Sequence, residues 1–278
     1  MTKSFQKIHL QTVQFNFSAK RQTIEEASSL TKFAIVGIRR TGTTLIRTTL
    51  NNHPDIKCYG EVFNFGRRFK RRRGHRCEGS YRRHINCIPF GHIRDAVNRP
   101  STVQAFLDQL YTNTDSRSVG FKLTMTQKNR FPNVMDYFKQ HEIHVIQVIR
   151  RNILKTLVSR SVKKVTGQSH TTTGMQKTQI NLEIPRLLPE LERFDCENSQ
   201  WEKDCAGLPF MKVYYEDFVA DKSQHLEEML HFLNEEVRQD IGSNLKKGNP
   251  DNLSEIILNY DEVHNHLTKS RFAWCLEG

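Results

Sequence analysis

The stretch from residue 32 to residue 60 restricts the possible folds more than any other part of this sequence. It begins with a short apolar run, KFAIVGI over residues 32–38, and passes through the loop RRTGTT. Apolar residues then recur at helical spacing as far as Leu50, and Pro54 has to end that helix. A second strand candidate, IKCYG, covers residues 56–60. Two strands joined by a helical crossover form a βαβ unit, which predicts a parallel sheet with a right-handed connection.

The rest of the chain continues to alternate strands with helices. Three further apolar runs, one of them the β-branched IHVIQVI, predict strands over 118–125, 143–149 and 211–215. Amphipathic segments predict helices over 133–141, 152–164, from 187 onward, 224–236 and 253–267. The sequence therefore predicts an α/β fold, a P-loop-like doubly wound sheet that is mainly parallel, with helices on both faces.

Composition favours a single domain over the 278 residues. Hydrophobic residues make up 37% of the chain and charged residues 26%, without a long Pro/Gly/Ser tract that could act as a linker. We expect a polar N-terminal arm over residues 1–30 and an irregular basic insertion over 64–100. We also expect a Thr-rich loop over residues 166–178.

The charge of the chain indicates an anionic partner. The formal net charge is +12, and residues 67–83 contribute +8 of it through nine Arg and Lys and one Glu. Six dispersed cysteines are typical of an intracellular protein rather than of a disulfide framework. Because neither the N-terminus nor any later stretch carries the run of about 20 apolar residues that spans a bilayer, we expect a soluble, cytoplasmic protein.

The loop after the first strand has the frame of a phosphate-binding loop. Gly37 and Gly42 are separated by four residues, and Thr43 and Thr44 open the helix. Backbone N–H groups and the helix dipole of such a loop hold an anion. A Walker A motif places Lys directly after the second Gly, but Thr43 stands there, which argues against an NTP kinase or ATPase.

The cations of this loop stand before the second glycine instead, at Arg39 and Arg40. A basic residue followed by Thr-Gly-Thr-Thr resembles the 5'-phosphosulfate loop of sulfotransferases that use PAPS (3'-phosphoadenosine 5'-phosphosulfate). The resemblance implies that residues 39–44, which are Arg39, Arg40, Thr41, Gly42, Thr43 and Thr44, bind the donor. It further implies that Arg40 stabilises the charge on the leaving phosphate.

A second anion motif follows the strand over 143–149. Arg151 and Ser159 are eight residues apart, on the strand end and the next helix. In the same family this pattern binds the 3'-phosphate of PAPS, and a guanidinium and a hydroxyl so placed can converge on one phosphate. The segment VYYEDF over 213–218 is similar to another family segment, in which Glu216 and Asp217 are expected to be structural.

The resemblance covers about residues 32–235. The C-terminal segment over 246–263 is also similar to the C-terminal end of some bacterial members. The chain lacks the RKG-x-x-G-D-W segment of the enzymes that act on phenols and steroids, which disfavours such acceptors. Similar glycan-directed and bacterial enzymes carry an acidic residue after the second strand as general base, and here that residue is Glu61. His170 and His53 are alternative bases, and Lys122 is a further contact for the sulfuryl group or the acceptor.

The sequence also allows a metal site and two other functions to be considered. Cys77, His84, Cys87 and His92 do not have a usual zinc spacing, so no metal is expected. The two rival functions are a P-loop kinase with an unusual lysine position and a non-enzymatic binder of an anionic polymer through residues 67–83. That basic patch has too few aromatic residues for a base-stacking surface, which argues against nucleic acid. We expect transfer from PAPS to a hydroxyl or amine of a carbohydrate or small metabolite.

Overall fold

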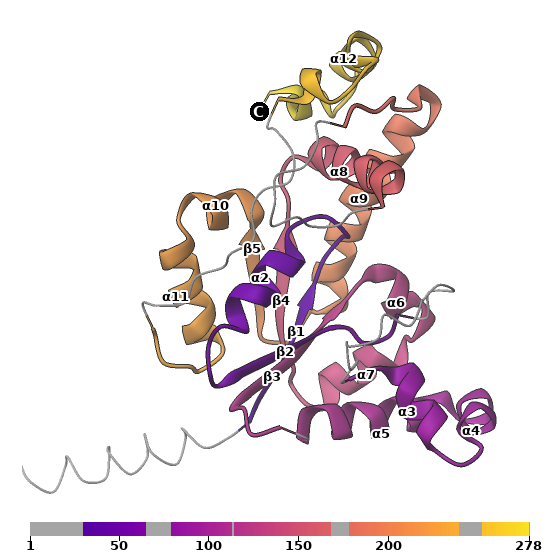
Figure 1. The fold of residues 1–278 in the computed structure, drawn as a ribbon, viewed down its shortest axis with the longest axis vertical. Helices are drawn as coiled ribbons and strands as arrows, with labels where there is room; N and C mark the ends of the chain where they lie inside the picture. The colour runs from indigo at the N-terminus through magenta and orange to yellow at the C-terminus, as the bar shows by residue number, and fades with distance from the viewer. Residues whose placement is uncertain (1–29, 65–78, 113, 168–177, 239–251, 278) are drawn as a thin grey trace, which may run out of the picture.

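A five-stranded sheet forms the centre of the molecule, with the strand order β2-β3-β1-β4-β5. The computed structural model describes residues 30–64, 79–112, 114–167, 178–238 and 252–277 (Figure 1). The strands are β1 (Thr31–Val36), β2 (Ile56–Glu61), β3 (Ser118–Leu123), β4 (His144–Ile149) and β5 (Phe210–Tyr214). Every neighbouring pair of these strands is parallel, which confirms the predicted sheet.

Helices fill the connections between the strands and the C-terminal region. The α-helices are α2 (Thr43–Leu50), α3 (Tyr81–Cys87), α4 (Gly91–Val97), α5 (Arg99–Thr112), α6 (Met125–Arg130), α7 (Asn133–Gln140), α8 (Ile153–Thr166), α9 (Ile184–Asp204), α10 (Tyr215–Ala220), α11 (Lys222–Phe232) and α12 (Tyr260–Thr268). Two short 3-10 helices cover Leu253–Glu255 and Ala273–Leu276. None of the helices in the described ranges has both the length and the apolarity that crossing a bilayer requires.

Both faces of the sheet are buried, as the continuous apolar strands predict. Along β1, Phe33 and Ile35 belong to the core beneath α2 and α11, whereas Ala34 and Val36 belong to the core beneath α5 and α7. Figure 1 shows α2, α10 and α11 on one side of the sheet and α5, α6 and α7 on the other. A third apolar cluster joins α8 and α9 to α12. The doubly wound arrangement is therefore confirmed.

The expectation of irregular structure over 64–100 is wrong for its described part. Helices α3 and α4 and the start of α5 occupy residues 81–100. Glycine in this segment indicated a loop, but Gly91 instead allows close packing. A Cβ at this position would lie 2.0 Å from the carbonyl oxygen of Ile85. Residues 65–78, the N-terminal arm over 1–29 and residues 168–177 of the Thr-rich loop lie outside the described residues.

The predicted continuous helix over 253–267 is also interrupted. Its first residues, Leu253–Glu255, form a 3-10 turn instead. Ile257 then forms an isolated parallel bridge with Ile180. The side chain of Asn259 donates to the carbonyl oxygen of Leu182 at 2.9 Å and accepts from its N–H at 3.0 Å. These bonds fix Asn259 against Leu182, and α12 begins only at Tyr260.

The strand order positions the candidate site. Strand β3 pairs with both β1 and β2, so the predicted βαβ unit is parallel but its two strands are not neighbours. Strands β1 and β4 are neighbours. The chain that leaves β1 continues to β2 at one edge of the sheet, whereas the chain that leaves β4 continues to β5 at the other edge. Ligands of open α/β sheets bind beyond the carboxyl ends of the strands at such a reversal. The loops after β1 and β4 therefore emerge side by side.

Candidate active site

The loop between β1 and α2 is held by close contacts with neighbouring strands. Gly37 and Gly42 have φ of +151° and +99°, in the region that favours glycine. A Cβ on Gly37 would lie 2.5 Å from the carbonyl oxygen of Val148, and one on Gly42 would lie 2.4 Å from the ring of Tyr215. Arg40 also has a positive φ of 82°. The backbone of this loop has little room to take another conformation.

Gly42 is the N-cap of α2, and the first turn of that helix contains no acidic residue. The first N–H groups of a helix have no partner inside it and attract an anion. The hydroxyl of Thr41 donates to the carbonyl oxygen of Ile38 at 2.8 Å, a hydrogen bond within the loop that stabilises its conformation. Thr43 is buried, and Thr44 accepts a hydrogen bond from Lys122 Nζ at 3.0 Å. The loop therefore presents backbone donors toward the end of the sheet.

Arg40 and Ser159 are brought together across 119 positions of sequence. The Nε of Arg40 donates to the Ser159 hydroxyl at 3.0 Å, which joins the first anion motif to the helix of the second. Burial lowers the pKa of Arg40, and the nearby Arg150 guanidinium lowers it further. Two guanidinium groups close enough to repel each other are a favourable place for an anion.

Arg151 makes its described contacts elsewhere, at the junction of β5 and α10. Its guanidinium forms a bidentate ion pair with Asp217, with Nη2 2.7 Å from Oδ2, and lies over the ring of Tyr214 at 4.0 Å. Its backbone N–H donates to Glu216 Oε2 at 3.0 Å. The hydrogen bond from Arg151 lowers the pKa of Asp217, and the same bond raises the pKa of Arg151. The described contacts do not join Arg151 to Ser159.

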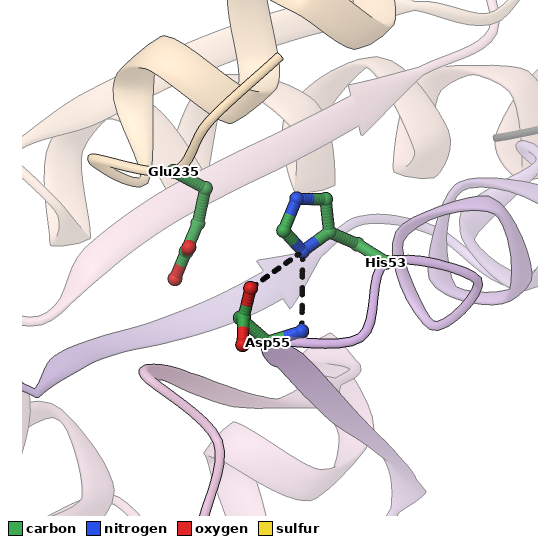
Figure 2. A group of neighbouring side chains, drawn as sticks. All are labelled: His53, Asp55 and Glu235. Atoms are coloured by element: carbon green, nitrogen blue, oxygen red, sulfur yellow. Dashed lines mark hydrogen bonds and ion pairs between the residues drawn. The ribbon is translucent and has the colours of Figure 1, made fainter. Parts of the chain in front are cut away.

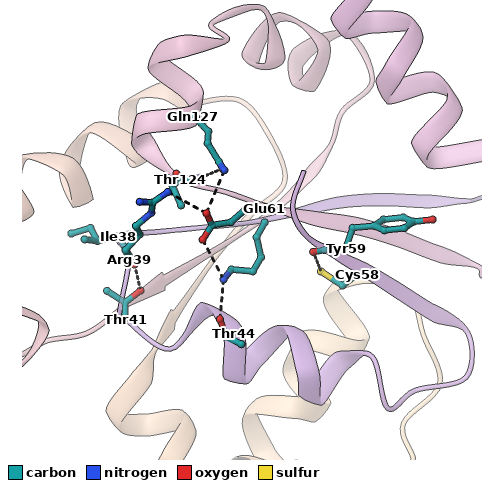
Figure 3. Close-up of polar contacts among 10 residues, drawn as sticks. Ile38, Arg39, Thr41, Thr44, Cys58, Tyr59, Glu61, Thr124 and Gln127 are labelled. Carbon is teal, nitrogen blue, oxygen red and sulfur yellow. Dashed lines mark hydrogen bonds and ion pairs between the residues drawn. The ribbon is translucent and has the colours of Figure 1, made fainter. Parts of the chain in front are cut away.

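Glu61 lies at the carboxyl end of β2 and collects donors from three other segments (Figure 3). Arg39 Nη2 is 3.2 Å from its Oε2, and Gln127 Nε2 donates to the same oxygen at 3.4 Å. Lys122 Nζ lies 4.0 Å from Oε1. Glu61 pairs with Lys122 in the register of β2 and β3, after an irregularity that follows Tyr59. The carboxylate therefore lies beside the loop, facing its positive side chains.

Positive charge gathers around this carboxylate. Burial lowers the pKa of Lys122, although Glu61 opposes the shift. Burial also lowers the pKa of Lys163, and Arg40 and Arg39 add to the shift while Glu61 opposes it. Shifts of this kind mean that these cations would be stabilised by a further negative charge. The arrangement can bind an anion with several charges and can polarise the bonds of that anion.

The predicted alternative bases differ in position. His170 lies outside the described residues. His53 is only 1% exposed; its Nδ1 accepts from the N–H of Asp55 at 3.2 Å and its Nε2 donates to the carbonyl oxygen of Glu236 at 3.1 Å. Figure 2 shows His53 beside Asp55 and Glu235. These three could surround a metal ion by position, but both ring nitrogens of His53 already bond the backbone. His53 is therefore a structural residue and not an accessible base.

The described members of the cysteine and histidine group have separate partners. His84 Nδ1 lies 2.9 Å from Gln109 Oε1, and His92 Nε2 lies 2.8 Å from Asn86 Oδ1. Cys87 is exposed as a free thiol, and Cys77 lies outside the described residues.

Three residues of the site were missed by sequence reasoning. Lys163 follows Ser159 by four residues on α8, so helical spacing from Ser159 would have found it. Tyr215 follows β5 and packs on Gly42, a contact that no local pattern indicates. Gln127 caps α6 in a capping box and also reaches Glu61. The capping pattern T-x-x-Q predicts the first of these roles but not the second.

A family comparison matches this architecture. The model of the Sulfotransferase family matches residues 33–239, so the chain belongs to the sulfotransferase family. The match begins within β1, covers the other four strands and ends before α12. A search of curated proteins finds no match to the chain.

Several solved structures are similar to the chain. A sulfotransferase from Alicyclobacillus acidocaldarius is 12% identical, with a TM-score of 0.47, over 80% of this chain and 88% of that one. The sulfotransferase domain from the curacin biosynthetic pathway is 16% identical, with a TM-score of 0.49, over 80% and 82%. A mouse sulfotransferase complexed with PAP is 13% identical, with a TM-score of 0.42, over 91% and 79%.

Proposed function

We propose that the protein transfers a sulfuryl group from PAPS to a hydroxyl or amine of a carbohydrate or small metabolite. The observation that carries the proposal is the hydrogen bond between Arg40 and Ser159, because it unites the two anion motifs at neighbouring strand ends. Family membership supports sulfuryl transfer, and a donor with phosphates at two positions fits two such motifs. A P-loop kinase is disfavoured because Thr43 replaces the lysine that it needs.

In this proposal the 5'-phosphosulfate of the donor occupies the loop. The backbone N–H groups at the start of α2 bind its oxygens, and Thr41, Thr43 and Thr44 line the same turn. Arg39 and Arg40 supply positive charge on the open side. Ser159 and Arg151 bind the 3'-phosphate, for which Arg151 has to leave Asp217 or share its donors with it. Arginine and backbone donors thus provide the charge stabilisation, without a required metal.

The transfer step breaks one bond to sulfur and forms another. The acceptor oxygen or nitrogen attacks sulfur, and the bond between sulfur and the bridging oxygen of the phosphate breaks. Glu61 takes the proton of the acceptor, while Arg40 stabilises the charge that develops on the phosphate of the leaving PAP (3'-phosphoadenosine 5'-phosphate). Lys122 contacts both Glu61 and Thr44, so it can hold a sulfuryl oxygen between them.

Titration calorimetry with PAP and with ATP-Mg tests the donor. We expect PAP to bind more tightly than ATP-Mg by at least about tenfold, because ATP lacks the 3'-phosphate that Arg151 and Ser159 would bind. The reverse order would favour the kinase. A chain that binds neither nucleotide, but binds heparin or RNA, would favour the polymer binder of residues 67–83.

A transfer screen with 35S-labelled PAPS over sugars, lipids, phenols and peptides tests the reaction. Arg40→Ala should lower transfer by about a hundredfold to a thousandfold, and Glu61→Gln should lower it by about a hundredfold, as expected for a general base. Glu192→Gln is the matched control, because Glu192 is an exposed residue of α9. Undiminished transfer by Glu61→Gln would contradict the role of Glu61 and leave the donor assignment intact. The cytoplasmic location and the single domain over 1–278 remain predictions.

A further inference from the structure

Helix α4 carries its apolar residues toward solvent. Phe90, Ile93 and Val97 are 78%, 62% and 81% exposed, and they follow one another at spacings of three and four residues. Ile93 and Val97 are four residues apart and so lie on one face of α4, and Phe90 directly precedes the helix as its N-cap residue. A soluble protein ordinarily turns such a face inward, and an exposed apolar patch marks a surface that binds a partner.

The outward orientation of this face is fixed by hydrogen bonds on the opposite face. The Asp95 carboxylate points inward, where it accepts from the Tyr81 hydroxyl and from Thr102 Oγ1 at 3.1 Å. Arg99 adds two donors, at 3.3 and 3.2 Å. These bonds lower the pKa of Asp95 against the effect of its burial. Rotating α4 to bury its apolar face would break all of these bonds.

The packing of α4 against α3 opposes the same rotation. Gly91 is buried, and a Cβ there would lie 2.0 Å from the carbonyl oxygen of Ile85. The apolar surface continues from α4 into a groove of about 420 Å³ between α4 and α5, which Ile88 and Ala105 help to line. The fold thus holds the stripe of Phe90, Ile93 and Val97 on the outside. We name this stripe the α4 apolar stripe.

The helices α3 and α4 carry exposed positive charge, and Arg94 lines the same groove as Ile93 and Val97. Arg82, Arg83 and Arg94 are exposed, and from Gly79 to Leu107 the sequence holds only one acidic residue, the inward-facing Asp95. This charge argues against a second copy of the chain as the partner, because two stripes could meet only with their arginines close together. Figure 1 places α4 at the periphery of the molecule, where a flat surface can reach it.

We propose that the α4 apolar stripe, with Arg82, Arg83 and Arg94, binds the surface of an anionic membrane. A short amphipathic helix with an aromatic residue and flanking arginines can insert its apolar side chains among lipid headgroups while the cations pair with the anionic lipids. The protein would then act at a membrane surface without spanning it. Binding of this kind needs no donor nucleotide, so it goes beyond the proposed transfer reaction.

Co-sedimentation of the full chain with vesicles tests the proposal. The probes are vesicles of phosphatidylcholine alone and vesicles with about 30% phosphatidylserine, at about 0.1 M salt. We expect binding to the anionic vesicles only. The triple variant Phe90→Ser, Ile93→Ser, Val97→Ser should bind about tenfold more weakly or worse, because each buried CH₂ contributes to membrane affinity. Val165→Ser removes an equally exposed apolar side chain from α8 and should change nothing.

Fluorescence of Phe90→Trp gives a second readout that does not depend on the triple variant folding. Its emission should shift to the blue with anionic vesicles, relative to the parent chain with Trp201 and Trp274. Equal vesicle binding by the parent and triple variant would overturn the proposal, because attraction by basic residues alone would then suffice. Absence of vesicle binding by the parent would overturn it too. A dimer in sedimentation equilibrium that the triple variant loses would assign the stripe to self-association instead.

Discussion

The two candidate anion-binding regions of this molecule differ in how their positive charges are held. The loop of Gly37 to Gly42 is packed against β4 and Tyr215, and burial together with the nearby Arg150 guanidinium lowers the pKa of its Arg40. The Arg151 region is exposed, and its guanidinium is already paired with Asp217. The first region pairs Arg39 with Glu61 but also gathers Arg40, Arg150 and Lys163 near one another, whereas the second pairs its guanidinium directly with Asp217.

This difference separates binding from catalysis. Charge held in place by a packed loop needs no rearrangement when a reaction develops negative charge, so it can lower a barrier. A guanidinium that must first release a carboxylate contributes to binding only the free-energy difference between its old ion pair and its new one. It therefore favours one ligand over another with a smaller gain in affinity. We therefore expect substitutions in the first region to lower the rate and substitutions in the second to change nucleotide preference.

Arg40→Ala should produce the largest effect. We expect kcat to fall by about a hundredfold to a thousandfold, as for the loss of one preorganised donor to a developing charge. PAP affinity should fall by less, because the backbone of the loop remains. The measurement is steady-state transfer from 35S-labelled PAPS together with calorimetry of PAP. Arg117→Ala is the control on the opposite, N-terminal edge of β3. A loss confined to affinity would remove the distinction between the two regions.

Gly42→Ala should have the next largest effect. The added methyl group would meet the Tyr215 ring at 2.4 Å, and alanine is strained at a φ of +99°. We expect PAP to bind at least about tenfold more weakly and the melting temperature to fall. Gly60→Ala is the matched control, because a Cβ on Gly60 meets nothing within 4 Å. Unchanged PAP affinity in Gly42→Ala would show that the loop is not the rigid partner in the comparison.

Asp217→Asn isolates the second region and should change affinity only a few-fold. Releasing Arg151 from a charged competitor should tighten PAP by about threefold to tenfold, in line with exposed ion pairs. Adenosine 5'-phosphosulfate, which has no 3'-phosphate, should bind as before. Calorimetry of both nucleotides, with Arg151→Ala as the opposite case, checks this. Weaker binding of PAP by Asp217→Asn would mean that the carboxylate orients Arg151 and does not compete for it.

The smallest effect is a dependence on pH at Lys163. Burial and Arg40 hold the pKa of this lysine below its ordinary value of 10.5, and only the protonated form attracts an anion. PAP affinity should therefore decline as pH rises through that lowered pKa, at a lower pH than for an unperturbed lysine. Kd for PAP from about pH 7 to about pH 10 measures this, since the phosphates are already ionised there. Lys163→Arg should move the decline upward, whereas Lys164→Arg should leave it in place.

The sequence predicts the elements of this fold better than their arrangement. Apolar runs such as residues 143–149 fall within a residue or two of the observed strands, because a strand buried on both faces leaves a mostly apolar, β-branched run. The position of β3 between β1 and β2 carries no such local signal. Helices α3 and α4 were not predicted because the basic, Gly- and His-rich composition of 64–100 indicated irregular structure, although Gly91 serves close packing.

The candidate site divides in the same way. Arg40 and Ser159 could be named from two short motifs, and the structure joins them. The position of Glu61 could be predicted because it ends a strand, but its donors Arg39, Lys122 and Gln127 come from segments far apart in sequence. The pairing of Arg151 with Asp217 depends on β4 and β5 being neighbours, which no spacing reveals.

The contact of Tyr215 with Gly42 has a consequence for how the chain matures during synthesis. A ribosome makes the glycine loop early, but the aromatic ring that seats this loop is added more than 170 residues later, with the edge strand β5. A nascent chain that stops after α8 has both motifs and lacks the support for either. The loop should therefore reach its packed conformation only after α10 has left the exit tunnel, because Tyr215 is then free to contact Gly42.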